Sequence, residues 1–142
     1  MILSPNIWGP HGWKFIHYVT LAYPINNPDD ETKKNYKNFF TMLQFVLPCK
    51  VCANHYAENL KKLPLTDEVL SSRENLVKWA IDIHNIVNVS KNKPIMKYEE
   101  ALKAIGTDEQ CKENIVTSNN NIYYLLLIVF ALICIAVVYK KK

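Results

Sequence analysis

The stretch Pro48-Cys49-Lys50-Val51-Cys52, followed three residues later by His55, separates two segments of helical periodicity and carries the most distinctive chemistry of the chain. Two thiols at this spacing can close a small disulfide ring and reopen it, and the same spacing can supply half of a zinc site. Pro48 suits the first turn of a helix, and a helix that begins near Cys49 would stabilise thiolates through its N-terminal dipole. From the pair alone, metal binding and redox chemistry are equally good interpretations.

Apolar side chains recur with a 3.6-residue period on both sides of this stretch, which predicts an all-α chain. We expect helices over residues 8–23, 29–47, 49–62 and 71–89, and a short fifth helix over residues 98–105. The predicted core stripes are Trp8, Phe15, Val19 and Ala22 on the first helix, and Tyr36, Phe39, Phe40, Leu43 and Val46 or Leu47 on the second. The periodicity thus predicts four longer helices followed by a short fifth.

The composition excludes two classes of protein. Of the 17 Lys and Arg residues, three are the terminal lysines 140–142, so the rest of the chain carries 14 basic against 13 acidic residues. This near-neutral domain lacks the electrostatic footprint of a nucleic-acid-binding protein, and we expect no nucleic-acid partner. Four cysteines in 142 residues are too few for a secreted, disulfide-stapled scaffold.

The end of the chain differs from the part before it. Residues 106–121 are polar and predict a linker, which contains a lone Cys111. Residues 122–139 carry no charge, and a helix of this length reaches about 27 Å, close to the thickness of a bilayer core. Tyrosines flank this segment, and the basic tail 140–142 follows it. We therefore expect residues 1–105 to form the functional domain and residues 122–139 to form a single transmembrane helix.

Histidine and asparagine side chains shift the balance between metal and redox chemistry. All four histidines fall in predicted helical segments, beside Trp, Tyr, Asn or Cys: His11, His17, His55 and His84. An i, i+4 row on the fourth predicted helix changes from apolar to hydrogen-bonding residues, as the wall of a site would: Leu76, Ala80, His84 and Asn88. Rings and amides around a dithiol suit a flat, hydrogen-bonding redox cofactor better than a metal ion. A zinc site remains an alternative, with the ligands Cys49, Cys52, His55 and either His84 or Cys111.

Three motifs follow one another along the chain. They are Trp8-Gly9-Pro10-His11-Gly12-Trp13 with His17, then Cys49-x-x-Cys52-x-x-His55, and then Trp79 with His84-Asn85-Ile86-Val87-Asn88 and Lys93-Pro94. In this order and near this spacing they resemble the Erv/ALR family of FAD-linked sulfhydryl oxidases; each motif alone is weak, but together they are specific. The resemblance covers roughly residues 8–105 and implies an FAD cofactor and a homodimer of four-helix bundles, each with a short fifth helix.

The resemblance also implies a role for each residue of these motifs. Cys49 would exchange with an incoming dithiol, and Cys52 would pass electrons to the isoalloxazine ring of FAD. The residues implied to bind FAD are Gly9, Gly12, Trp13 and His17 on the first helix, and His55, His84, Asn85, Asn88 and Lys93 beyond it. Members of the family oxidise a protein dithiol and return the electrons to O2 as H2O2. The implied partners are therefore O2 and a protein dithiol substrate, either thioredoxin-like or a virion protein.

The chain departs from the family's pattern at three places. Pro10 and His11 stand where many relatives have Arg or Lys, which removes an expected phosphate contact. Ile81 and Tyr98 occupy the positions at which many relatives tie the fourth helix to the next segment by a disulfide, and we expect packing to replace that brace. Cys111 is single, so it cannot act as a second dithiol that feeds the central pair, and the substrate is expected to bring its own.

These observations predict a membrane-anchored, FAD-dependent thiol oxidase. A C-terminal anchor without an N-terminal signal peptide predicts a catalytic domain in the cytosol; the terminal lysines favour the opposite orientation, and we give slightly more weight to the first argument. The Asn- and Lys-rich composition fits the small enzymes of large cytoplasmic DNA viruses, so a viral membrane is expected. The alternatives are a membrane-anchored zinc-binding adaptor and an inactive, oxidase-like interaction module.

Overall fold

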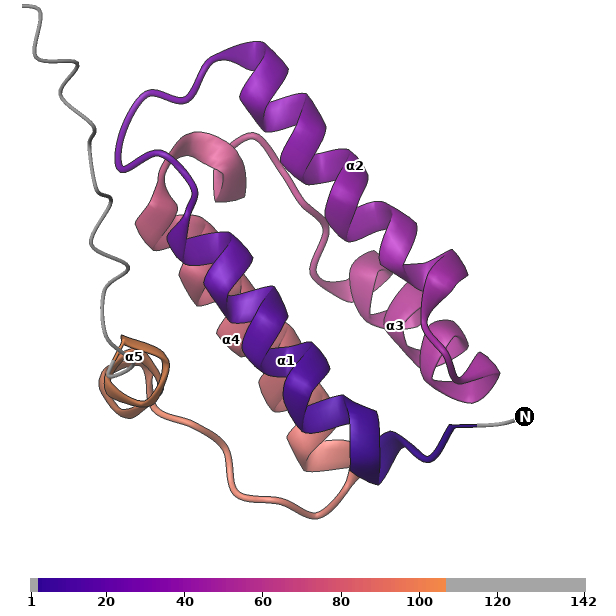
Figure 1. Ribbon diagram of the computed structural model, residues 1–142. Coiled ribbons are helices and arrows are strands. Elements are labelled where there is room, and N and C mark those ends of the chain that lie inside the picture. Colours follow the sequence, from indigo (N-terminus) through magenta and orange to yellow (C-terminus); the bar gives the residue numbers. More distant parts are fainter. Residues whose placement is uncertain (1–2, 107–142) are drawn as a thin grey trace, which may run out of the picture. The chain divides into compact units, whose positions relative to one another are not determined.

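The computed structural model describes residues 3–106, whose regular secondary structure is helical (Figure 1). The elements are α1 (Pro5–Leu21), α2 (Asp30–Val46), α3 (Lys50–Lys62), the 3-10 helix η1 (Val69–Ser71), α4 (Arg73–Ser90) and α5 (Tyr98–Gly106). An isolated bridge between Asn26 and Ser72 is the one β-type pairing in this part of the chain. The prediction of an all-α fold with four long helices and a short fifth is therefore confirmed.

Each long helix begins at a side chain that accepts a backbone N–H, as helix N-termini require. Ser4 accepts from Asn6 at the start of α1, and Asp29 accepts from Thr32 at 2.6 Å at the start of α2. The remaining two N-caps are Cys49 for α3 and Ser72 for α4. The sequence therefore sets these four helix starts locally, before any tertiary packing is considered.

The four long helices form two pairs. α1 runs antiparallel to α4 and packs on it, α2 packs on α3, and the short α5 contacts both α1 and α4 (Figure 1). Aromatic side chains join the two pairs: the ring centroids of Phe40 and Trp79 lie 5.1 Å apart, and those of Tyr23 and Tyr36 lie 4.6 Å apart. The main core is thus an aromatic layer between the helix pairs, and we call it the aromatic core. Its buried members are Ile16, Tyr23, Phe40, Tyr56, Leu65, Leu70, Leu76, Trp79, Ala80 and Ile83.

The core stripe predicted for α1 was wrong in part. The buried residues of α1 are Ile16, His17 and Thr20, whereas Phe15 is 59% exposed. Phe15 instead makes an edge-on contact with Phe39 of α2, at a centroid distance of 6.2 Å. Periodicity identifies an apolar stripe, but α1 carries two neighbouring stripes and the position of α4 decides which one is buried. The stripe predicted for α2 fits better, with Phe40 fully buried and Tyr36, Phe39, Leu43 and Leu47 packed against the aromatic core. Val46, the alternative to Leu47, is 67% exposed.

A second, smaller cluster holds α5 against α4. Ile81, which is fully buried, packs with Val77 and Ala101, and Met96 lies against this group. The Tyr98 hydroxyl donates a hydrogen bond of 2.6 Å to Asp82 Oδ1. At the two positions where many relatives carry a disulfide, this chain therefore uses apolar packing, as expected, and adds one hydrogen bond.

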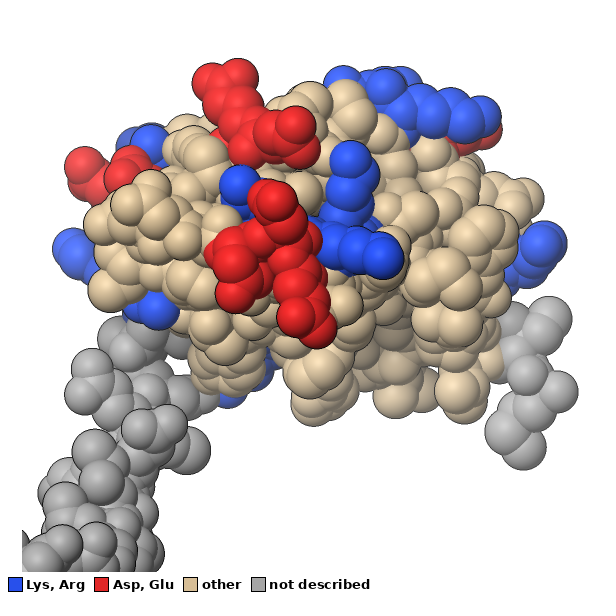
Figure 2. Space-filling model, turned by 90° about the horizontal axis from the view of Figure 1, so that it is seen from above, with Lys and Arg blue, Asp and Glu red and all other residues tan. Residues whose placement is uncertain are grey.

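Charges of both signs are interspersed on the face shown in Figure 2. Two of the ion pairs in the described part of the chain are helical neighbours: Lys78 with Glu74 at 2.6 Å and Lys33 with Asp30 at 3.8 Å. Exposed pairs of this kind contribute a few tenths of a kcal/mol, at most about 1 kcal/mol. A face of mixed sign does not generate the strong positive field that attracts a polyanion.

The predicted membrane segment, residues 122–139, lies outside the described residues, as do the tail 140–142 and the linker 106–121 apart from Gly106. Among residues 3–106, no helix combines the length and the apolar character needed to cross a membrane.

Candidate functional site: a disulfide and an imidazole cluster

Cys49 and Cys52 form a disulfide at the first turn of α3. Cys49 has extended backbone dihedrals and is the N-cap of the helix, so its Sγ accepts the backbone N–H of Cys52 at 3.2 Å. Their Cα atoms lie 5.2 Å apart, within the usual range for a disulfide. Pro48 precedes the cap and cannot extend α2, which ends at Val46. The local sequence thus places the pair where a helix N-terminus favours negative charge on sulfur.

The two cysteines differ in environment. Cys49 is buried, with 9% of its surface exposed, and Cys52 is half-buried. Val51 between them is exposed, and His55 one turn further along α3 is exposed as well. Among the described residues, a backbone N–H is donated to the sulfur of Cys49 but not to that of Cys52, so a thiolate on Cys49 is the better stabilised of the two when the disulfide opens.

A second group of chemically distinctive residues joins α1 to α4, and we call it the imidazole cluster: Trp13, His17 and His84. His17 Nε2 and His84 Nδ1 lie 3.0 Å apart and share a hydrogen bond. The indole of Trp13 stacks on the His84 ring at a centroid distance of 4.0 Å with only 5° between the planes. Three residues that the motifs predicted for cofactor binding are therefore in mutual contact, although 67 positions separate the two histidines in sequence.

Both imidazoles are neutral at physiological pH. Burial lowers the pKa of His17 to about 4. The pKa of His84 is also lowered to about 4, first by burial and then by the positive charge that His17 and Lys93 would add. A neutral imidazole has one donor and one acceptor nitrogen, so the shared hydrogen bond couples the tautomers of the two rings.

The imidazole cluster leaves a polar atom without a partner. His17 is 3% exposed, and its Nδ1 has no hydrogen-bond partner among the described residues. Nε1 of Trp8, nine positions earlier and so on the opposite side of α1, is also buried without a partner among the described residues. Buried polar atoms are nearly always paired in proteins, so each of these atoms is a place where a bound ligand would supply the missing hydrogen bond. A cofactor with ring nitrogens, carbonyl oxygens and hydroxyl groups, such as FAD, fits these atoms; Trp8 was not among the predicted binding residues, and only its unpaired N–H reveals it.

The two glycines of the first motif differ in what surrounds them. A Cβ at Gly12 would lie 3.3 Å from two ring atoms of Trp8, so the small residue lets that indole pack over the helix. A Cβ at Gly9 would meet nothing within 4 Å. Packing within the chain gives one reason for Gly12, and the predicted roles of both glycines in cofactor binding stay predictions.

The other predicted binding residues on α4 and after it lie close in sequence to the imidazole cluster. Asn88 is buried at 8% exposure, and Lys93 is exposed. Asn85 is half-buried, and its side-chain amide is paired with the backbone of Met96: Nδ2 donates at 2.9 Å and Oδ1 accepts at 2.8 Å. Of the predicted binding residues, Trp13, His17 and His84 therefore contact one another directly. The positive charge of Lys93 is one of the causes that lower the pKa of His84.

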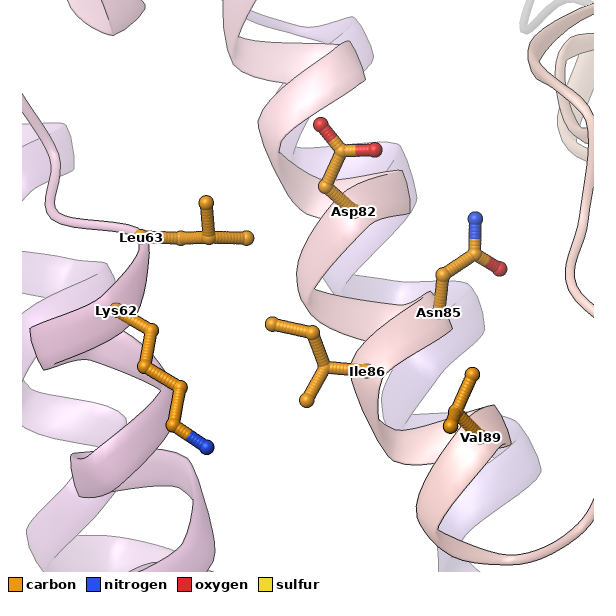
Figure 3. Close-up of a pocket in the computed structure, with 6 residues that line it drawn as sticks. All are labelled: Lys62, Leu63, Asp82, Asn85, Ile86 and Val89. Atoms are coloured by element: carbon orange, nitrogen blue, oxygen red, sulfur yellow. The ribbon is translucent and has the colours of Figure 1, made fainter.

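A shallow pocket of about 480 Å³ lies between the end of α3 and α4 (Figure 3). Its lining residues are Lys62, Leu63, Asp82, Asn85, Ile86 and Val89. Positions 84 and 86 differ by about 200° around a helix, so this pocket opens on a different face of α4 from His84. Of these lining residues, only Asn85 was predicted as a site residue. The apolar ones could not be recognised from sequence, because Leu, Ile and Val on a helix look like ordinary core residues. The imidazole cluster and the disulfide, rather than this hollow, carry the reactive chemistry.

The zinc alternative lacks support in the described part of the chain. Within residues 3–106, no group of three or more His, Cys, Asp or Glu side chains is placed to hold a metal ion. Two of the four ligands proposed for zinc, Cys49 and Cys52, are joined to each other, and His55 is exposed to solvent.

A bundle with a C-x-x-C disulfide at a helix start and a buried imidazole pair between two other helices defines the class of helical dithiol–disulfide redox proteins. The sequence pattern of the Erv1 / Alr family matches residues 10–108. The chain belongs to this family, and the resemblance predicted from the three motifs is confirmed.

Relatives and solved structures agree with this assignment. A protein of Acanthamoeba polyphaga mimivirus, named a probable FAD-linked sulfhydryl oxidase, is 56% identical over 103 residues, which cover 72% of this chain and 71% of the relative. A FAD-linked sulfhydryl oxidase of African swine fever virus is 32% identical over 95 residues, or 66% of this chain and 75% of the relative. The crystal structure of the FAD-binding domain of Erv1 from Saccharomyces cerevisiae matches with a TM-score of 0.68 at 25% identity, over 76% of this chain and 99% of that one.

Proposed function

We propose that this protein is an FAD-dependent thiol oxidase that forms disulfides in a protein dithiol substrate and passes the electrons to O2, giving H2O2. The observation that carries the proposal is the Cys49–Cys52 disulfide at the N-terminus of α3, in a chain of the Erv1/Alr family. A disulfide at a helix start is placed for exchange, because the thiolate released when it opens is stabilised there.

The substrate half of the reaction is a thiol–disulfide exchange. In the roles that the family resemblance implies, a substrate thiolate attacks the Cys49 sulfur, the S–S bond to Cys52 breaks, and a mixed disulfide with Cys49 forms while Cys52 leaves as a thiolate. Cys49 is 9% exposed and Cys52 is half-buried, so this order requires the substrate to reach the more buried cysteine. The second substrate thiolate then attacks the substrate sulfur of the mixed disulfide and releases Cys49, whose thiolate accepts the Cys52 backbone N–H. The substrate leaves as a disulfide, and the enzyme keeps two electrons in its dithiol.

Closing the Cys49–Cys52 bond again releases two electrons and two protons. FAD, when bound, supplies a two-electron acceptor that oxygen can reoxidise with formation of hydrogen peroxide. Within this chain, His17 Nδ1 and Trp8 Nε1 offer hydrogen bonds to such a group, and the stack of Trp13 on His84 offers flat aromatic surface. The exposed ammonium of Lys93 suits the negatively charged diphosphate of FAD. The same positive charge contributes to the lowered pKa of His84.

The proposal includes a homodimer. Large apolar side chains are exposed on α1 and α2, namely Ile7, Phe15, Met42, Phe45 and Val46. The Phe15–Phe39 contact joins the two helices that carry these side chains, and exposed apolar surface of this kind marks interaction sites. A second copy of the chain, placed on the same face by a two-fold axis, would cover them.

The proposal also keeps the membrane anchor. Residues 122–139 are uncharged over a bilayer-spanning length, and the basic tail 140–142 follows. A single-pass anchor of this kind would hold the oxidase domain on a membrane, and we propose a viral membrane with the domain in the cytosol.

The test uses the full chain, with its visible absorption spectrum and its oxygen consumption as readouts. The proposal expects a yellow protein whose flavin band bleaches when a dithiol is added without oxygen and returns, with H2O2, when air is admitted. Cys49→Ser and Cys52→Ser should each lower turnover at least about 1,000-fold while FAD stays bound. A colourless protein with stoichiometric zinc would support the adaptor instead, and a flavoprotein that consumes no oxygen with any dithiol would support the inactive module.

A further inference from the structure

The segment that joins α4 to α5, residues 91–97, is tied to α4 at both ends, and we call it the strap. At its start, the carbonyl of Asn88 accepts two backbone N–H groups, from Lys91 at 3.0 Å and from Lys93 at 2.8 Å. Asn92 between them has φ of 53°, in the left-handed region that asparagine tolerates. This closing turn ends α4 and fixes the first three residues of the strap.

At its end, the strap is held by one side chain of α4. The amide of Asn85 makes a two-point contact with Met96: Nδ2 donates to the carbonyl at 2.9 Å, and Oδ1 accepts the N–H at 2.8 Å. The Met96 side chain then packs against Val77, Ile81 and Ala101. The backbone of Met96 therefore finds its partners in a side chain rather than in regular secondary structure, and both polar atoms of Asn85 face the strap.

Lys93 lies between the two tethers. It is exposed, forms no ion pair with any described residue, and its charge is near enough to lower the pKa of His84. The backbone N–H of Lys93 donates to the carbonyl of Asn88, one helical turn after His84 on α4, so the strap brings a cation to the end of α4 that carries the imidazole cluster. The position of that cation depends on how the strap is held. A lysine on a flexible loop would sample many positions, and holding it in one would cost conformational entropy on binding.

We infer that Asn85 is a positioning residue: its contact with Met96 fixes the strap so that the Lys93 ammonium is held ready for the anionic part of the cofactor. The role of Lys93 rests on the proposed function, because it takes the diphosphate of FAD as the anion. The contact between Asn85 and Met96 does not depend on that function. The inference differs from the role implied by the family resemblance, in which Asn85 would touch the cofactor directly.

Hydrogen exchange of the Met96 amide tests the tether without any cofactor. In the full chain without FAD, Asn85→Ala should speed exchange at Met96 about tenfold, the loss expected for one hydrogen bond. Asn35→Ala, an exposed asparagine on α2, is the matched control and should leave Met96 unchanged. An unchanged rate in Asn85→Ala would overturn the inference, whatever the protein binds.

A double-mutant cycle on the dissociation constant of FAD then tests how Asn85 acts. Asn85→Ala and Lys93→Ala should each raise the constant about tenfold, and the double variant should be no weaker than Lys93→Ala alone, because Asn85 acts through Lys93. Both single variants should also flatten the dependence of the constant on salt, which a general loss of stability would not do.

If the two effects multiply to about a hundredfold, Asn85 contacts FAD independently and the inference is wrong. If the unsubstituted chain binds no FAD at all, the proposed function fails, and the exchange rate at Met96 still decides whether the tether exists.

Discussion

The aromatic core and the imidazole cluster lie in the same bundle, but they differ in whether their buried polar atoms have hydrogen-bond partners. In the aromatic core, the Tyr23 hydroxyl donates to the carbonyl of Leu70 at 2.8 Å, and Trp79 Nε1 donates to the carbonyl of Leu63 at 2.9 Å. In the imidazole cluster, His17 Nδ1 is equally buried but has no partner among the described residues. A region selected for stability pairs its polar groups, whereas a region that binds a ligand keeps some for the ligand.

This difference distinguishes residues that stabilise the fold from residues that would bind the cofactor. Substitutions in the aromatic core should change the free energy of unfolding, and substitutions in the imidazole cluster should change cofactor binding. The predictions below probe each side of that division.

The largest expected effect is on the aromatic core. Phe40 is fully buried and contacts Trp79, so Phe40→Ala should lower the free energy of unfolding by about 3–5 kcal/mol, the loss of a buried aromatic plus a cavity. Urea denaturation at a protein concentration that keeps one oligomeric state measures this. Ile25→Ala, at a 63% exposed position outside the proposed dimer face, is the control and should cost less than about 1 kcal/mol. Equal losses in the two variants would contradict the assignment of the core.

Acid should weaken the fold through the imidazole cluster. The folded-state pKa of His17 and of His84 is about 4, below the 6.5 of an exposed histidine, so the unfolded chain binds more protons between these values. Stability is therefore fully present above pH 6.5 and falls as the pH drops toward 4, by on the order of 3 kcal/mol for His17. Unfolding measured from pH 7.5 to 4.5 checks the slope, which should shrink in His17→Leu. A flat profile in the unsubstituted chain would show that these histidines are not buried.

A smaller effect should follow from removing one hydroxyl of the aromatic core. Tyr23→Phe leaves the carbonyl of Leu70 without its donor in a fully buried position, which should cost about 1–2 kcal/mol. Tyr98→Phe removes a hydrogen bond of similar length to Asp82 at the surface, where water can replace it, and should cost less than about 0.5 kcal/mol. The thermal unfolding midpoints of the two variants give the comparison, and the reverse order would contradict it.

Sequence patterns were sufficient for the helices and for the family. The break at Pro48 and the apolar periodicity are local signals, and each helix lies within a few residues of its predicted bounds. Pro48 itself was expected in the first turn of α3, but it precedes the N-cap Cys49. The order of the three motifs was enough to identify the Erv1/Alr family. These features could be predicted because they depend on neighbours along the chain.

Features that depend on how helices face one another were not predictable in the same way. Phe15 was expected in the core but is exposed, because the position of α4 selects the stripe of Ile16 and Thr20. The tether between Asn85 and Met96 has no sequence signature, since its strength comes from the path of the strap in space. The unpaired Trp8 Nε1 likewise appears only when every hydrogen bond of the fold is counted.

The dissociation constant of FAD for His17→Leu tests the central claim most directly. Leucine removes the unpaired Nδ1, which favours the folded state, and also the hydrogen bond to His84, which disfavours it. Because these two changes oppose each other, the free energy of unfolding at pH 7.5 should stay within about 1 kcal/mol of the unsubstituted chain, while the constant should rise at least about tenfold. A constant that stays within about twofold would contradict the claim that the imidazole cluster keeps a hydrogen bond for the cofactor.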